Sequence, residues 1–200
     1  MKIEILAIAA ILGLSTIVAA DESPVLSAEE FLLGAAPHGC LTACCQTLKS
    51  RAAQSYTYYQ NTGHFIGGSG EWKINTHGYS GARDGFMNPA KQCVVNTGPL
   101  PAARYKLGYC KDTMHTPAVT RPCSFYLEPQ EPSKMCGRSA FFVHGCQCCT
   151  NGDHTEPPTN GCSAGCVVIS QENRVKLRVG DTVTVVQYEP KKSLEYPISE

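Results

Sequence analysis

The sequence predicts a mainly β, disulfide-rich domain: a compact β-sandwich or barrel with a short N-terminal helical extension. From residue 56 onwards, short apolar or alternating runs are separated by Gly, Pro and Asn, as in strands joined by turns. The chain of 200 residues also has 12 cysteines, which spread over most of its length. Many short strands with turn residues between them favour packed β-sheet. A chain of this length supports one domain with its own core.

The first twenty residues are expected to be a cleaved signal peptide. Lys2 precedes an uncharged stretch from Ile5 to Ala20, and Val18 and Ala20 occupy the −3 and −1 positions of a cleavage site. An uncleaved anchor is the alternative. The apolar run is shorter than the roughly 20 residues that a transmembrane helix needs, so we expect no membrane span after cleavage.

Residues 21–55 are predicted to form the helical extension. Ser27 and Glu30 make a capping box before an apolar run, and Gly and Pro residues then end the helix. A second short helix is predicted over residues 40–54 from apolar residues at helical spacing: Leu41, Cys44, Cys45 and Leu48.

The β domain is expected over residues 56–188, with a frayed tail over 189–200. Its predicted strands lie in the runs YTYYQ, HFIGGSGEWKI, CVVN, ARYKLGYC, SAFFVHG, CVVIS, VKLRVG and TVTVVQYE. Gly180 and Asp181 stand between the last two runs and predict a tight hairpin turn. Residues 111–135 are rich in proline and predict a long irregular loop.

The charge balance excludes one class of partner. Lys and Arg total 17, Asp and Glu total 17, and no basic run is present, so no nucleic-acid partner is expected. With zero net charge, we also expect no long-range steering of a charged substrate. In a secreted chain, most of the cysteines should be paired, although their connectivity cannot be deduced from the sequence.

The cysteine-rich stretch from His144 to Cys166 has three interpretations. The spacing of Cys146, Cys149, Cys162 and Cys166 is similar to that of a structural zinc site. Secretion disfavours it, because thiols in that compartment become paired, so we expect no metal and no other cofactor. In the second interpretation all five cysteines of the stretch are structural disulfide members.

The third interpretation is nucleophilic catalysis. His144 ends an apolar strand, and Cys166 stands on a tight turn before the next strand, so the two side chains can come within hydrogen-bonding reach. His144 could then accept the thiol proton and leave a thiolate nucleophile. Gly165 allows close backbone approach, and the N–H groups of Gly165 and Cys166 could form an oxyanion hole.

Several segments, taken in order, resemble the L,D-transpeptidase catalytic domain family, and specifically its subgroup of type VI secretion effectors. The matching segments are QNTGHFI, GYSG (residues 78–81), NTGPLPAARY (96–105), GRSAFFVHG (137–145), SAGCVVISQENRVKL and GDTVTVV. The resemblance covers residues 56–188 and implies the β-sandwich fold of that family. One departure is Ala164, which stands where many relatives have His. Another is the longer, cysteine-rich segment between His144 and Ser163.

The resemblance implies a role for particular residues. Cys166 would be the nucleophile and His144 its base, while Ser163 and Gly165 would shape the turn. Four more residues are candidates for holding the substrate: Arg138, Tyr79, Ser80 and Gly145.

The resemblance also implies an enzyme that acts on peptidoglycan stem peptides, and the expected signal peptide implies that it is secreted and extracellular. The thiolate would attack the carbonyl of the third stem residue and release D-alanine, and water or an amine would resolve the thioester. Such a protein would be antibacterial, and an unknown immunity or inhibitor protein would be a further partner. Two alternatives remain open: an inactive cell-wall-binding or inhibitory module, and a structural cysteine-rich secreted protein.

The cysteine count constrains the catalytic hypothesis. If Cys166 is free, one more of the 12 cysteines must be unpaired or paired outside the chain. If Cys166 is bonded to Cys162 instead, the protein would be a redox-controlled enzyme.

Overall fold

The computed structural model describes residues 44–45, 51–114, 119–146 and 162–191. The expected signal peptide over 1–20, most of the helical extension over 21–55 and the tail beyond 191 lie outside these residues. Residues 51–54, at the end of the helix predicted over 40–54, are not helical. Within the described ranges, no helix is long and apolar enough to cross a membrane.

The nine strands of the described chain form one mixed sheet in the order β3-β2-β1-β9-β5-β6-β7-β8-β4. Their bounds are β1 Ser55–Tyr59, β2 His64–Gly67, β3 Ile74–His77, β4 Tyr79–Ser80, β5 Arg104–Met114, β6 Val119–Pro129, β7 Phe142–His144, β8 Val167–Val168 and β9 Thr182–Val186. A four-residue helix, α2 (Gln171–Arg174), follows β8, and the short 3-10 turns are η1 Gly70–Trp72, η2 Arg83–Gly85, η3 Pro89–Lys91 and η4 Pro132–Met135. The mainly β prediction is confirmed.

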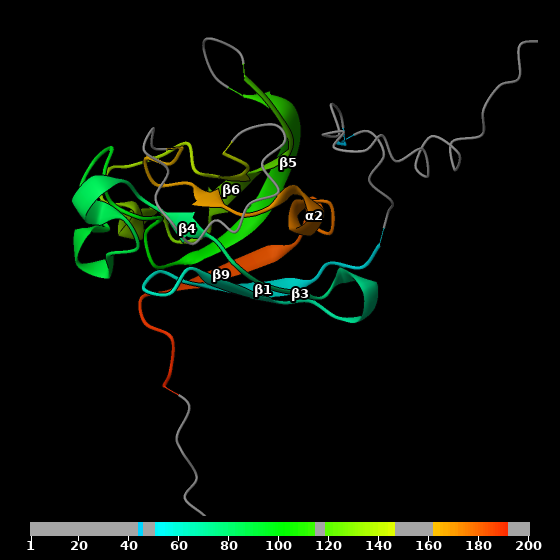
Figure 1. The fold of residues 1–200 in the computed structure, drawn as a ribbon, viewed down its shortest axis with the longest axis horizontal. Coiled ribbons are helices and arrows are strands. Elements are labelled where there is room, and N and C mark those ends of the chain that lie inside the picture. Colours follow the sequence, from blue (N-terminus) through cyan, green and yellow to red (C-terminus); the bar gives the residue numbers. More distant parts are fainter. Residues whose placement is uncertain (1–43, 46–50, 115–118, 147–161, 192–200) are drawn as a thin grey trace, which may run out of the picture. The chain divides into compact units, whose positions relative to one another are not determined.

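The sheet nearly closes on itself at Gly78. β3 and β4 are the two ends of the strand order, yet only Gly78 separates them in the sequence. The Gly78 N–H donates to the Gly63 carbonyl at 2.9 Å, and a Cβ at position 78 would lie 2.1 Å from the carbonyl oxygen of Val168. The chain therefore needs glycine where it passes from one edge of the sheet to the other. The predicted sandwich packing arises from a single curled sheet, with β1, β3 and β9 in one layer and β4 and β6 in the other (Figure 1).

The core lies between the two halves of this curled sheet. Side chains alternate along a strand, so every second residue points inward. The core residues of the strands include Tyr56, Tyr58, Phe65, Ile74, Tyr105, Leu107, Phe125, Leu127, Val143, Val167, Val183 and Val185. Because Val143 and Val167 face this core, their neighbours His144, Cys166 and Val168 belong to the opposite face of β7 and β8.

The predicted irregular loop over residues 111–135 is wrong. Most of this segment completes β5 and forms β6, which pair antiparallel over 11 residues each. The pairing is interrupted between Leu107 and Cys110 and again between Lys111 and Thr113. The second irregularity accommodates Pro122, which has no N–H to donate to a ladder and is tolerated at a bulge.

Two of the predicted strands are also wrong. The run CVVN forms turns, and Val94 and Val95 are exposed rather than packed in a sheet. The run VKLRVG follows α2 in further helical turns, with Lys176 and Leu177 N–H groups bonded to the carbonyls of Asn173 and Arg174. In both cases a short apolar run was too brief to specify a strand without a neighbouring strand to pair with.

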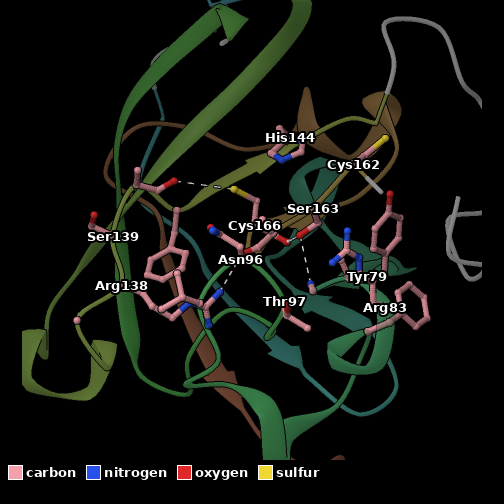
Figure 2. Close-up of a pocket in the computed structure, with 18 of the residues that line it drawn as sticks. Tyr79, Arg83, Asn96, Thr97, Arg138, Ser139, His144, Cys162, Ser163 and Cys166 are labelled. Atoms are coloured by element: carbon pink, nitrogen blue, oxygen red, sulfur yellow. Dashed lines mark hydrogen bonds between the residues drawn. The ribbon is translucent and has the colours of Figure 1, made fainter. Parts of the chain in front are cut away.

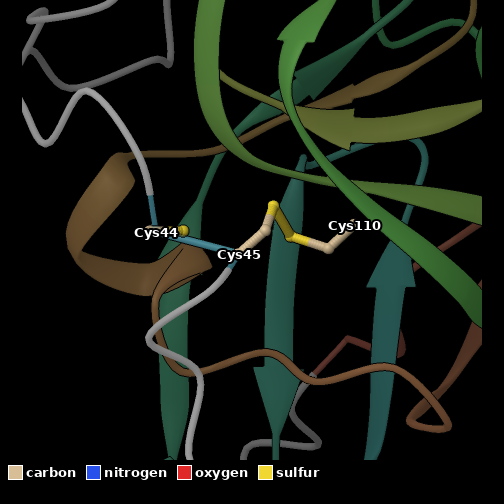
Figure 3. Close-up of side chains that lie close together, drawn as sticks. All are labelled: Cys44, Cys45 and Cys110. Carbon is tan, nitrogen blue, oxygen red and sulfur yellow. A yellow bond between two sulfur atoms is a disulfide. The ribbon is translucent and has the colours of Figure 1, made fainter.

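Four disulfides brace the described chain, and this confirms the disulfide-rich prediction: Cys44–Cys123, Cys45–Cys110, Cys93–Cys136 and Cys146–Cys162. The sulfur atoms of Cys44, Cys45 and Cys110 lie close together (Figure 3). Since all three are disulfide-bonded, they offer no thiolate to a metal ion. Asp112 also holds this corner, because its carboxylate accepts the Cys44 N–H at 2.9 Å and the Cys123 N–H at 3.2 Å.

Candidate active site

Cys166 and His144 come together through the pairing of β7 with β8. The two strands are parallel, with Val143 opposite Val167 and His144 opposite Val168. Continuing this register by one residue places Cys166 opposite Phe142, two residues from His144 and on the same face. Both side chains line one cavity, and Figure 2 shows His144 next to Cys166. The sequence predicted this juxtaposition from the His at a strand end and the Cys before the next strand.

His144 is held in the orientation that a general base needs. The ring is buried, and Nδ1 lies 2.7 Å from the Gly145 carbonyl oxygen. A carbonyl can only accept, so Nδ1 carries the hydrogen in the neutral ring. Nε2 is then the nitrogen that can take a proton. Gly145 itself does not line the cavity, so its part in the site is this carbonyl rather than the substrate contact expected of it.

Ser163 organises the turn that carries Cys166. Its hydroxyl donates to the Cys166 carbonyl at 2.7 Å and accepts the N–H groups of Gly165 at 3.1 Å and Gly81 at 3.2 Å. The turn is thereby fixed to the chain beyond β4. The Gly165 N–H, which we expected in an oxyanion hole, is engaged by this hydroxyl, whereas the Cys166 N–H stays the predicted oxyanion donor.

Arg138 ties the catalytic turn to the loop before β5. Its Nη2 donates to the carbonyls of Gly98 at 2.8 Å and Ala164 at 2.9 Å, and its Nη1 donates to the carbonyls of Pro99 at 2.7 Å and Gln92. Four of its five N–H groups are thus committed to backbone, which leaves little of the guanidinium for the substrate role expected of it. Gly165 lies directly against this group: its φ is +132°, and a Cβ there would be 2.1 Å from Nη2.

The alternation of β4 separates the two residues expected to hold substrate there. Tyr79 pairs with Val168, packs against Phe86 at a ring distance of 5.3 Å and lines the cavity. Ser80 points to the other face, is fully buried and accepts the Leu100 N–H at 2.7 Å. Tyr79 therefore stays a candidate for substrate contact, while Ser80 fixes the backbone at Leu100 and does not reach the cavity.

The cavity has a volume of about 1250 Å³, and the charged side chains of its described lining are all cationic. Its lining contains three arginines, Arg83, Arg121 and Arg138, together with His144, and no carboxylate from the described residues. The zero net charge of the whole sequence hid this local concentration, which is separate from the expectation of no long-range steering. A cationic, carboxylate-free cleft favours an anionic ligand.

The disulfide between Cys146 and Cys162 joins the end of the histidine strand to the start of the cysteine turn. This disulfide bears on two alternatives from the sequence analysis, the zinc site and a Cys162–Cys166 disulfide. It occupies two of the four cysteines of the zinc-like spacing, and it removes Cys162 as the redox partner of Cys166. In the part of the chain that the structure describes, Cys166 is the only free cysteine, and it is partly exposed.

The resting thiol is not pre-ionised. Desolvation of the sulfur disfavours the charged thiolate and raises the pKa of Cys166 to about 11, against opposing contributions from the Phe142 backbone and the cations Arg121 and Arg138. At neutral pH the protonated thiol is therefore the favoured form, and a thiolate forms only when the thiol gives its proton to a base.

We expect iodoacetamide, applied without reduction, to label Cys166 and none of the eight disulfide-bonded cysteines, because Cys166 is the only free one among the nine described cysteines. The raised pKa predicts that the labelling rate keeps rising up to at least pH 9.5, since only the thiolate reacts. Peptide mass analysis over a pH series measures this. A plateau near pH 7 would show a pre-formed thiolate, and recovery of Cys166 only in a disulfide would remove the nucleophile.

Several lining residues were missed by the sequence interpretation: Arg83, Asn96, Thr97, Arg121 and Ser139 (Figure 2 labels all but Arg121). Arg121 stands in the segment that was expected to be a loop, so nothing in the sequence placed it beside the cysteine turn. Asn96 and Arg83 have positive φ, at +58° and +52°, a backbone conformation that depends on tertiary contacts.

The family model of the Tlde1 domain matches residues 74–187, which is more than half of the chain. No curated protein matches the chain significantly in sequence.

Solved structures with similarity to the chain include three L,D-transpeptidases. The enzyme from Stackebrandtia nassauensis is 17% identical, with 71% of this chain and 59% of that chain covered and a TM-score of 0.41. L,D-transpeptidase 1 from Mycobacterium tuberculosis is 14% identical, with 67% and 59% covered and a TM-score of 0.41. The enzyme from Xylanimonas cellulosilytica is 15% identical, with 69% and 62% covered and a TM-score of 0.39. The chain thus spans about three-fifths of the length of these solved chains.

The family match runs from β3 through β9 and includes both His144 and the Cys166 turn. The chain therefore belongs to the Tlde1 domain family, the L,D-transpeptidase-type domain of type VI secretion effectors.

Proposed function

We propose that the protein is a cysteine-dependent L,D-transpeptidase or L,D-carboxypeptidase that acts on peptidoglycan stem peptides, with Cys166 as nucleophile and His144 as base. The observation that carries the proposal is the isolation of one thiol. Eight described cysteines are paired, while Cys166 is free, partly exposed and in a cavity with a buried histidine. A purely structural cysteine would gain nothing from that location.

The reaction follows from the two side chains. The Cys166 sulfur attacks the carbonyl carbon of the third stem residue while the thiol proton passes to Nε2 of His144. The C–N bond to D-alanine then breaks, and the imidazolium returns the proton to the departing amine, leaving a thioester. Water gives the carboxylic acid, and an amine gives an exchanged or cross-linked stem, and each regenerates the thiol.

The site supplies the groups that such a reaction requires. The raised pKa of the thiol means that the base must act during attack, and the His144 ring is oriented for it by the Gly145 carbonyl. The developing oxyanion would be stabilised by the Cys166 N–H, which the turn held by Ser163 presents beside the sulfur. No step requires a metal ion or an organic cofactor.

The disulfides support an extracytoplasmic place of action. Four disulfides in the described chain are typical of proteins that mature in an oxidising compartment. A secreted enzyme with this activity would meet bacterial cell walls directly and would act as an antibacterial agent. An immunity or inhibitor protein that covers the cavity is the partner that this role implies.

The activity is tested on a purified tetrapeptide stem, L-Ala-γ-D-Glu-diaminopimelate-D-Ala, with the disulfide-intact protein. We expect loss of D-alanine, seen by mass spectrometry as a tripeptide product. Added D-methionine should give an exchanged tetrapeptide if transfer competes with hydrolysis. An unchanged stem together with tight binding to insoluble cell walls would replace the enzyme with the binding module.

A further inference from the structure

Arg121 is an arginine of the cavity whose charge is balanced by no carboxylate of the described lining. It belongs to β6, lines the cavity with Cys166 and Tyr79, and its Nε is buried without a hydrogen-bond partner among the described residues. A buried donor that is left unpaired destabilises the fold, so its position at a cavity wall favours pairing with a ligand.

The other two arginines of the cavity do not offer the same capacity. Arg138 commits four of its N–H groups to backbone carbonyls of the loop before β5 and of the cysteine turn. Arg83 is exposed on η2, where water solvates its guanidinium. Of the three arginines, Arg121 is thus the one with a buried N–H group that has no hydrogen-bond partner among the described residues.

Arg121 also lies close to the reacting sulfur. Its charge acts on the Cys166 thiol and on the Tyr79 hydroxyl, lowering the pKa of each against the larger effect of burial. No carboxylate of the described lining neutralises it, so an anionic ligand would complete this part of the cavity.

We infer that Arg121 binds the C-terminal carboxylate of the stem peptide, that is, the carboxylate of the residue that is released. This inference rests on the proposed function. That carboxylate is attached to the Cα next to the scissile amide, so it lies within about 3.8 Å of the attacked carbonyl. A group that holds it must be a neighbour of the nucleophile, and guanidinium matches carboxylate with two parallel hydrogen bonds.

The consequence is a role for Arg121 in selecting among stems. It should favour the free carboxylate directly after the attacked residue, and it should discriminate against stems that are amidated at that end. Arg121 would then act as an exopeptidase-type specificity residue, which separates D-alanine release from cleavage within longer or blocked stems.

The experiment compares the tetrapeptide acid with its C-terminal D-alaninamide. Release of the last residue gives kcat/KM for each, and calorimetry with the Cys166→Ala protein gives each Kd without turnover. We expect the wild type to prefer the acid by about 10- to 100-fold, the range for a hydrogen-bonded charge. Arg121→Gln should reduce this preference to within about twofold, and Arg121→Lys should keep part of it.

Arg83→Gln is the matched control, because it also removes one positive charge from the cavity lining. It should retain the preference for the acid, whereas an equal loss in both variants would assign the effect to the general field and overturn the inference. A wild type that treats acid and amide alike would also overturn it, even if Arg121→Gln failed to fold. Discrimination in binding without any turnover would support the Arg121 site and reject the enzyme.

Discussion

The Cys166→Ser protein will keep the wild-type fold and lose D-alanine release by at least about a thousandfold, the scale of loss when a catalytic nucleophile is removed. Cys166 takes part in no described disulfide, and its sulfur makes a long contact, 3.9 Å, with the Ala140 carbonyl. A serine hydroxyl fits the same space but does not form the required nucleophile with this base. We therefore expect the free energy of unfolding to change by less than about 1 kcal/mol.

His144→Gln is the companion variant. Glutamine can keep a hydrogen bond to the Gly145 carbonyl but cannot accept the thiol proton, so kcat/KM should fall by about 10²- to 10⁴-fold. Thiol titration, stem turnover and urea unfolding of the two variants separate the hypotheses. If Cys166 were a structural disulfide member, Cys166→Ser would instead cost about 2–5 kcal/mol of stability. Unchanged turnover in Cys166→Ser would end the thioester mechanism.

The central pair of the site could be predicted because it depends on local sequence. A His at the end of an apolar strand and a Cys on a tight turn before the next strand need only those two strands to pair in parallel. The β7–β8 register supplies that pairing. The parity of strand residues could also have separated Tyr79 from Ser80, since neighbours on a strand point to opposite faces.

The cationic wall of the cavity could not be predicted, because it depends on long-range pairing. Arg121 reaches the site only through β6, and the prolines of that segment favoured a loop. An irregularity in the β5–β6 pairing accommodates Pro122, but bulge positions are not encoded in hydrophobic periodicity. The near-closure of the sheet could not be predicted either, because it depends on a single residue, Gly78, between the edge strands β3 and β4.

Replacing Asp181 with alanine will destabilise the protein by about 3–5 kcal/mol, the cost of breaking a buried ion pair by removing one partner. The Asp181 side chain is fully buried, and that of Arg51 is 7% exposed. The two form a bidentate pair, with Nη1 at 2.8 Å and Nη2 at 2.6 Å from the carboxylate oxygens. The same carboxylate accepts the N–H groups of Gln54 and Arg178, each at 2.8 Å.

Asp181 also stabilises the protein by fixing the register between β1 and β9, so its replacement costs more than the ion pair alone. Gln54 and Asp181 immediately precede β1 and β9, which pair in parallel from Ser55 opposite Thr182. The Asp181 contacts therefore fix the first step of that register, and a slip by one residue would turn the core side chains of a strand outward. The cost therefore falls on the parallel pairing of β1 with β9.

Urea unfolding of single and double variants measures the coupling. Asp181→Ala and Arg51→Ala should each be strongly destabilised, and the double variant should cost less than the sum, because no charge is left buried without its partner. The matched control is Asp84→Ala, which breaks the exposed pair with Lys91 at 3.3 Å and should cost less than about 1 kcal/mol. Equal effects of the Asp181 and Asp84 changes would mean that burial adds nothing to the Arg51 pair. In that case the parallel joint between β1 and β9 would be held by its backbone ladder and apolar side chains alone.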